Sequence, residues 1–282
     1  MKVNFIGVGA IGLPMAQQIS QAGHDVVGMD ALPATCEKAR SQGISMVGCV
    51  ADLLVADVTI VMVATPQQLE KLVDDVLENA AVSTYWVIMS TVGPASIRKQ
   101  GDRLRQSGAK VVDAPVTGGV ARAKTGQLVI FAAGAQGDID AVRPVVKAMG
   151  DVRLAGMSLG DGQAIKVVNQ HLCAVHLAAA AEALSLAASL GLDPAQVLSM
   201  IAQGAAGSWM LSDRGPRMLR GADVEVTSAV DIFVKDSGLV ALAAQDCHAQ
   251  VPLLDVAHTR FIQASAAGLG KRDDSCVIET WR

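Results

Sequence analysis

Short apolar runs and helical patterns alternate through the first part of the chain. Short apolar runs bounded by turn residues predict buried strands. Helical stretches such as residues 95–106 lie between them. The alternation predicts a doubly wound, mostly parallel α/β sheet. The runs that predict strands are residues 2–6, 26–29, 58–63, 85–89, 110–112, 128–132 and 152–154.

The alternation stops near Gly160, and every later segment has a helical pattern. Residues 163–190 form one long apolar helical pattern, which ends before Gly191 and Pro194. Glycine and proline separate the helices expected afterwards. We therefore expect two domains, a doubly wound domain over residues 1–160 and an all-α domain over residues 161–282, joined by the long helix. The later helices are expected at residues 194–203, 208–219, 228–249 and 253–267.

Composition narrows the class of protein. The chain has 282 residues, 51% of them hydrophobic and only 3% aromatic, which suits parallel strands covered by closely packed helices. A net charge of -4 without a basic run argues against nucleic acid as a partner. The five cysteines never form a C-x-x-C pair, so neither a disulfide framework nor a zinc site is expected.

Three features favour a cytoplasmic protein. A strand pattern that begins at Lys2 leaves no room for a signal peptide. The uncharged apolar stretch at residues 167–181 is too short and too polar to span a bilayer and is read as a buried helix. Scattered cysteines are also typical of proteins from a reducing compartment.

A glycine-rich turn follows the first predicted strand. In the G-x-G-x-x-G pattern, the first glycine permits the tight turn, the second lets the backbone approach a pyrophosphate, and the third allows close helix packing. The following helix would direct its free N–H groups toward the phosphates. The pattern therefore predicts a Rossmann-type nucleotide site formed by Gly7, Val8, Gly9, Ala10, Ile11 and Gly12.

Asp30 ends the second predicted strand, eighteen residues after Gly12. A carboxylate there would accept hydrogen bonds from the adenosine ribose hydroxyls and would repel a 2′-phosphate. NAD is therefore the expected cofactor, and Ala31 rather than an arginine follows the acid. The alternative is that Asp30 is a solvated acid at a strand end.

Two further motifs, at residues 113–119 and 160–170, point to a family. Together with the glycine turn, they resemble the β-hydroxyacid dehydrogenases. The segment 113–119, D-A-P-V-T-G-G, is similar to that family's substrate loop, with Thr117 in place of the usual serine. The resemblance covers essentially the whole chain. It implies that Thr117, Gly118 and Gly119 bind the substrate carboxylate, since small residues expose N–H groups in a concave turn. An ordinary surface turn is the alternative.

The segment 160–170 resembles the family's catalytic stretch, G-x-G-x-x-x-K-x-x-N. The resemblance assigns the catalytic lysine to Lys166, with Asn169 and Gln170 one helical turn further along. Either amide could contact substrate. Lys166 would accept the proton of the substrate hydroxyl, which requires its pKa to fall from about 10.4. Burial in a closed site would lower it.

Three other sites follow from the resemblance. Thr65 and Pro66 match a loop that closes over the cofactor, and Thr91 is expected near the nicotinamide ribose. Helix capping is the plainer role for such hydroxyls, including that of Ser96. Lys235, in a segment similar to the family's F-x-x-K-D motif, would approach the nicotinamide. Its alternative is a surface ion pair with a neighbouring acid.

The expected activity is oxidation of a small hydroxy acid with NAD. Three segments, residues 205–210, 228–236 and 270–275, look most like the family branch that acts on L-threonate, a four-carbon sugar acid. Activity on 3-hydroxyisobutyrate or tartronate semialdehyde is the alternative within the family, and a non-catalytic dinucleotide-binding module is the alternative outside it. No metal site is expected, because the five histidines lack partners at ligand spacing. The apolar second half favours a homodimer or homotetramer.

Overall fold

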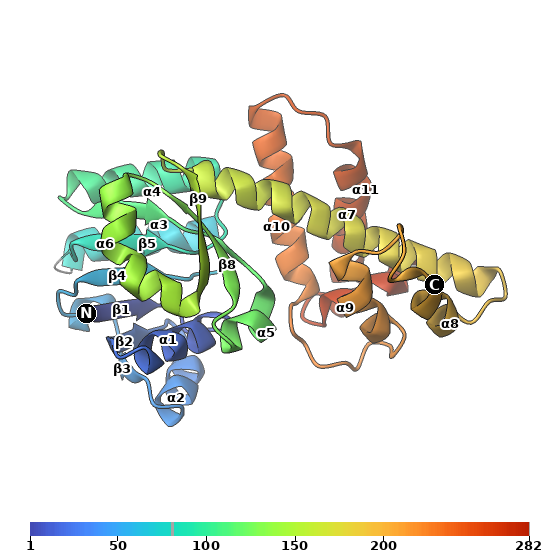
Figure 1. The fold of residues 1–282 in the computed structure, drawn as a ribbon, viewed down its shortest axis with the longest axis horizontal. Coiled ribbons are helices and arrows are strands. Elements are labelled where there is room, and N and C mark those ends of the chain that lie inside the picture. The colour runs from blue at the N-terminus through green and yellow to red at the C-terminus, as the bar shows by residue number, and fades with distance from the viewer. Residues whose placement is uncertain (80–81, 282) are drawn as a thin grey trace. The chain divides into compact units, whose positions relative to one another are not determined.

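The computed structural model describes residues 1–79 and 82–281 (Figure 1). The chain divides into two compact units, Met1–Lys166 and Val167–Arg282. The expected boundary at Gly160 lies a few residues earlier. Helix α7, Asp161–Ser189, contains the point of division, because it begins in the first unit and continues into the second.

A twisted sheet forms the centre of the first unit. Within the described residues it has nine strands in the order β3-β2-β1-β4-β5-β6-β8-β7, and β9 pairs with β8. The first six strands of this order, from β3 through β2, β1, β4 and β5 to β6, run parallel to one another. Strand β8 runs antiparallel to both β6 and β7. The predicted doubly wound, mostly parallel sheet is confirmed. The strands are β1 Lys2–Ile6, β2 Asp25–Met29, β3 Ser45–Val47, β4 Val58–Val61, β5 Tyr85–Ile88, β6 Lys110–Asp113, β7 Val116–Thr117, β8 Leu128–Ala133 and β9 Gly150–Gly156.

Helices cover both faces of this sheet because its strands are apolar on both sides. Successive side chains of a strand point to opposite faces, so Val87 joins one core cluster while Trp86 and Ile88 join another. The first cluster includes α1 and α6, and the second includes α3 and α4. The helices of this unit are α1 Gly12–Gln21, α2 Pro33–Ser41, η1 Val50–Asp52, α3 Pro66–Asn79, α4 Pro94–Gln106, α5 Gly119–Lys124, α6 Gln136–Val146 and η2 Lys147–Met149.

Three local differences separate this unit from its sequence prediction. The predicted strand 58–63 ends at Val61, and the backbone N–H of Val63 donates to the Ser90 hydroxyl instead. Strands β3 and β7 were not predicted; β7 has only two residues, which is too short to show a period of two. Helix α5 begins at Gly119, where only a loop was expected.

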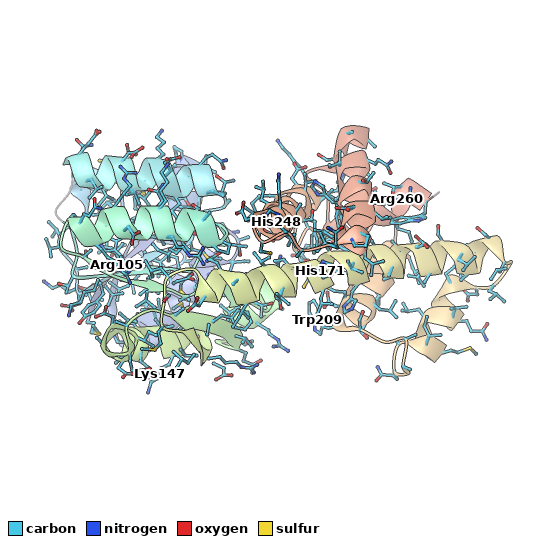
Figure 2. The ribbon with its side chains drawn as sticks, turned by 90° about the horizontal axis from the view of Figure 1, so that it is seen from above. Arg105, Lys147, His171, Trp209, His248 and Arg260 are labelled. Carbon is cyan, nitrogen blue, oxygen red and sulfur yellow. The ribbon has the colours of Figure 1, made fainter. Side chains whose placement is uncertain are left out.

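The second unit is helical throughout, as predicted. Its core contains Leu177 and Leu184 of α7 together with Phe233 and Phe261, whose rings lie 5.0 Å apart. Arg260, labelled in Figure 2, places its guanidinium 4.3 Å from the centre of the Trp281 ring. The elements after α7 are α8 Pro194–Ile201, α9 Trp209–Met218, α10 Val230–Asp246, α11 Pro252–Ala264, η3 Ser265–Leu269 and η4 Asp274–Trp281.

At several ends, the predicted helices extend one to three residues beyond the helices of the structure. Local backbone geometry explains the differences. Ser208 precedes α9 as its N-cap, with its hydroxyl accepting from the N–H of Leu211 at 3.0 Å. Ala229 precedes α10, and His248 leaves that helix with a positive φ of 57°. The expected helix 253–267 is α-helical only as far as Ala264 and continues as a π-helical turn, Ser265–Leu269, in which Gly268 has a positive φ of 84°.

Helix α7 is, among the described residues, the one helix long and apolar enough to cross a membrane by length and composition alone. A single such helix is weak evidence of a membrane span, because core helices of water-soluble proteins pass the same test. Six of its residues are buried in the core of the second unit, namely Ala174, Leu177, Ala178, Ala180, Ala181 and Leu184.

Candidate active site

The glycine turn links β1 to α1, and each glycine has a distinct environment. Gly7 has a positive φ of 94°, and a Cβ there would lie 2.4 Å from the carbonyl oxygen of Met62. At Gly12 a Cβ would lie 1.9 Å from the carbonyl oxygen of Gly7. Only glycine permits these two approaches. By contrast, a Cβ on Gly9 would meet no atom within 4 Å.

This geometry fits a dinucleotide phosphate group. The open space beside Gly9 lies at the N-terminus of α1, where free N–H groups and the helix dipole favour an anion. In the described structure no side chain caps this helix, and no acidic residue lies in its first turn. Pro14 falls in that first turn, where its missing N–H has little effect. Val8, Ala10 and Ile11 supply the rest of the turn.

Asp30 lies directly after β2 and contacts the glycine turn. One carboxylate oxygen accepts from the N–H of Val8 at 3.0 Å, and the other from the N–H of Leu32 at 2.9 Å. The acid is therefore held in place rather than freely solvated. Arg40 lines the same small surface pocket, which sequence reasoning missed because Arg40 belongs to the following helix.

The loops after β4 and β5 carry the next predicted residues. Thr65 precedes Pro66 at the start of α3, and its hydroxyl accepts from the N–H of Gln68 at 3.1 Å. Thr65 is thus a helix cap in this structure, which is the plainer of its two expected roles. The N-cap of α4 is Gly93, with no side-chain cap bond, and Thr91 is half-buried two residues earlier.

A buried polar network joins the Thr91 loop to the start of α7, and sequence reasoning missed it. The carbonyl oxygen of the Gln163 side chain accepts from the N–H groups of Val92 and Gly93, each at 3.0 Å. Its amide nitrogen donates to the backbone oxygen of Ser90 at 2.9 Å and to an Asp113 carboxylate oxygen at 3.0 Å. Gln163 and Asp113 are both 0% exposed.

Asp113 therefore has a different role from the one that its place in the predicted substrate loop suggests. Its second carboxylate oxygen accepts from the backbone N–H groups of Gly160 and Gln163, each at 3.0 Å. Burial raises the pKa of Asp113 to about 6, while the hydrogen bonds from Gln163 and Gly160 oppose that rise. Gly162 packs so close that a Cβ there would lie 2.5 Å from the carbonyl oxygen of Phe131.

The predicted substrate residues lie between β7 and α5 in the first unit. Thr117 ends β7 and pairs with Val129. Gly118 and Gly119 have φ values of 131° and 67°, which turn the chain into α5. The side chain of Arg122 lies against Gly118, since a Cβ there would be 2.8 Å from its Cδ. This arginine adds a positive charge that sequence reasoning did not consider.

Lys166 lies in the second turn of α7 and is buried, with 6% of its surface exposed. Gln163 precedes it by three residues and Gln170 follows it by four, so the three share one face of the helix. Burying the charged amine of a lysine in an apolar helix has a high desolvation cost unless other groups stabilise it.

The remaining predicted residues gather around Asp236 in the second unit. The Gln170 amide nitrogen donates to one Asp236 oxygen at 2.5 Å, and Lys235 forms an ion pair with the other at 2.6 Å. Asn169 donates to the side-chain oxygen of Gln170 at 2.8 Å. The ion pair expected as the alternative for Lys235 is therefore present, although Asp236 is buried rather than at the surface.

The C-terminal segment that resembled the L-threonate branch contributes to packing. Asp274 accepts from Arg214 at 2.8 Å, and Asp273 accepts from Arg217 at 2.8 Å. Both aspartates are 0% exposed. This part of the resemblance therefore has a structural explanation within the second unit, in a cluster that holds the chain end against α9.

Comparison with known sequences gives the same family over the whole chain. Residues 2–160 match the family described as the NAD binding domain of 6-phosphogluconate dehydrogenase. Residues 160–281 match the family described as NAD-binding of NADP-dependent 3-hydroxyisobutyrate dehydrogenase. The chain is 36% identical to an L-threonate dehydrogenase of Cupriavidus necator, covering 98% of this chain and 95% of that protein. It is 32% identical to an L-threonate dehydrogenase of Escherichia coli, covering 98% and 93%.

Solved structures agree with these matches. A 3-hydroxyisobutyrate dehydrogenase of Salmonella typhimurium is 31% identical, with a TM-score of 0.91 over 99% of both chains. A Mycobacterium tuberculosis 3-hydroxyisobutyrate dehydrogenase, determined with L-serine, is 29% identical with a TM-score of 0.86, covering 100% of this chain and 99% of that one. The chain therefore belongs to the β-hydroxyacid dehydrogenase family, and it is an NAD-dependent hydroxyacid dehydrogenase.

Proposed function

We propose that this dehydrogenase oxidises a four-carbon sugar acid of the L-threonate type, with Lys166 as its general base. The observation that carries the proposal is a buried lysine on the same helix face as Gln170, in a chain whose relatives at 32–36% identity include L-threonate dehydrogenases. A lysine buried at the start of an apolar helix is costly unless it has a function there, and a positioned lysine can serve as a general base.

Each residue group then has a task in the reaction. NAD, when bound, supplies the acceptor for a hydride. Lys166 accepts the substrate hydroxyl proton on its Nζ, and in reverse it returns that proton to the developing alkoxide. Asn169 and Gln170 supply amide groups that orient the hydroxyl, and Asp236 holds Gln170 in place. Lys235 lies beside Asp236 and is assigned to the nicotinamide end.

The substrate carboxylate is assigned to the turn formed by Thr117, Gly118 and Gly119. Two consecutive glycines with positive φ expose backbone N–H groups to an anion, and Arg122 packs against the same turn. The dinucleotide is assigned to the glycine turn, Asp30 and the Thr91 loop. Thr65 and Pro66 belong to the adjoining loop, where Thr65 also caps α3.

The sequence alternative, a dehydrogenase for 3-hydroxyisobutyrate or a reductase for tartronate semialdehyde, uses the same residues. The solved relatives named 3-hydroxyisobutyrate dehydrogenase favour keeping it as the second candidate. We also propose that the protein is cytoplasmic and that α7 is a helix of the folded enzyme rather than a membrane span. Its buried Lys166 and its share of the helical core support that assignment.

A screen of purified protein against hydroxy acids tests the proposal. The panel contains L-threonate, D-threonate, D-glycerate, 3-hydroxyisobutyrate and L-serine, each with NAD and with NADP, and the formation of NADH or NADPH is followed by absorbance. The highest kcat/KM is expected for L-threonate with NAD. A kcat/KM for 3-hydroxyisobutyrate or D-glycerate that is higher than that for L-threonate would support the second candidate instead. Tight NADH binding without turnover of any acid would support a non-catalytic module.

A further inference from the structure

We propose that Gln163 is a positioning residue of the dehydrogenase, and that its buried side-chain amide holds the Thr91 loop in the register that the cofactor and Lys166 require. The expected effect of Gln163 on catalysis rests on the proposed function, whereas its effect on the Thr91 loop does not. Gln163 lies outside the residues of the glycine turn, the substrate turn and the Lys166–Gln170 face to which sequence reasoning assigned chemistry.

The hydrogen bonds of Gln163 leave no part of its amide unused. Its oxygen accepts two backbone N–H groups from one loop, and its nitrogen donates to the backbone of that loop and to Asp113. An amide side chain can donate two hydrogen bonds and accept two. Gln163 makes all four of them in a fully buried place, and a buried network of this kind specifies one arrangement.

The network connects three segments to which separate tasks were assigned. Ser90, Val92 and Gly93 surround Thr91 after β5. Asp113 ends β6 and leads into the substrate turn. Gln163 itself lies one helical turn before Lys166. A shift of this one side chain therefore moves the Thr91 loop relative to the first turns of α7, and all these residues belong to the first unit.

The donor and acceptor pattern also makes the network sensitive to charge. Asp113 presents only acceptor oxygens when ionised, and it faces the amide nitrogen of Gln163 at 3.0 Å. Replacing Gln163 by glutamate brings two acceptors together. Replacing Asp113 by asparagine brings two donors together. Making both changes restores one donor opposite one acceptor at this contact, and leaves the Ser90 carbonyl oxygen facing a carboxylate oxygen in place of the Gln163 amide nitrogen.

Four variants test this arrangement as a double-mutant cycle. They are Gln163→Leu, Gln163→Glu, Asp113→Asn and the double variant Gln163→Glu with Asp113→Asn. Gln100→Leu is the matched control, because Gln100 is also a buried glutamine of the first unit, with a hydrogen bond from Arg103. Each protein is measured for kcat and KM on the best acid of the screen, for NADH affinity by fluorescence, for melting temperature and for hydrogen exchange.

Hydrogen exchange gives a readout that needs no turnover. The N–H groups of Val92 and Gly93 lose their acceptor in Gln163→Leu, so the peptide containing them is expected to exchange at least tenfold faster. NADH affinity is expected to fall severalfold. The kcat is expected to fall roughly tenfold to a hundredfold, because small misplacements of reacting groups have effects of that size. Gln100→Leu is expected to lower the melting temperature without changing exchange at the Thr91 loop.

The double variant separates positioning from general stability. It is expected to recover kcat at least fivefold over Gln163→Glu, whereas a purely structural role would move only the melting temperature. Unchanged exchange at the Thr91 loop in Gln163→Leu, or no recovery in the double variant, overturns the proposal. If the wild-type protein oxidises no acid, the proposed function fails, and exchange and NADH affinity still decide whether Gln163 holds the loop.

Discussion

Lys166 and Lys147 are both lysines of the first unit, but only Lys166 is buried. Replacing Lys166 by alanine is expected to lower kcat about a hundredfold to ten-thousandfold, which is the usual contribution of a general acid–base group. NADH binding is expected to remain. The exposed residue Lys147, labelled in Figure 2, supplies the control Lys147→Ala, for which steady-state kinetics should match the wild type. A near-normal kcat in Lys166→Ala would remove the lysine from the mechanism.

Asp113 predicts a pH dependence of stability with a definite sign. Its pKa of about 6 lies above the ordinary value of 3.8, so between these values the folded chain holds the proton more tightly than the unfolded chain. The free energy of unfolding therefore decreases as pH rises through that window, and this group accounts for about 3 kcal/mol of the decrease.

The variant Asp113→Asn lacks this dependence. Its disrupted hydrogen bonds lower stability at every pH, but its deficit relative to the wild type should shrink as pH rises from about 4 to about 7. Urea unfolding at several pH values measures the difference. The exposed residue Asp25 provides the control Asp25→Asn. Parallel curves for wild type and Asp113→Asn would contradict the assignment.

At the scale of elements, the turn from β1 to α1 contains two glycines that differ in what surrounds them. Gly12→Ala places a Cβ against the Gly7 carbonyl, so it is expected to lower the free energy of unfolding by about 1–3 kcal/mol. Gly9→Ala meets no atom and should leave the melting temperature unchanged or slightly higher. Yet its methyl group would enter the space assigned to the phosphates.

NADH titration therefore separates the two variants. Gly9→Ala is expected to bind NADH at least tenfold more weakly than the wild type while remaining folded. Because the two proteins should have similar melting temperatures, the wild type is the reference for this affinity. Full NADH affinity in Gly9→Ala would mean that the dinucleotide does not approach the backbone at this turn. An unchanged melting temperature in Gly12→Ala would contradict the close packing of α1 against the turn.

The elements also show which parts of the fold a sequence can predict. Helix α7 was predicted almost to its ends, because a long apolar helical pattern terminates at a glycine. Strand β7 was missed, since Val116 and Thr117 form too short a segment and their pairing with β8 arises from the tertiary fold. The end of β4 was misplaced because Val63 donates to Ser90, a residue 27 positions away.

At the scale of the whole molecule, the second unit exposes many large apolar side chains, including Leu172 of α7, Leu242 of α10 and Val256 of α11. Large exposed apolar patches are typical of subunit interfaces. We propose a homodimer or homotetramer and expect sedimentation of the purified protein at a mass of at least two chains. A monomer at micromolar concentration would contradict this.

Local patterns in the sequence were enough to establish the fold class and the family, and to predict Lys166 as the catalytic lysine, because periodicity and short motifs are local properties of the chain. Gln163 lacked any such signal. Its place is decided by Ser90 and Asp113, which are 73 and 50 residues away, and only the tertiary structure brings their polar atoms together. Burial then makes those contacts matter, because a polar group removed from water has to find its hydrogen bonds within the protein.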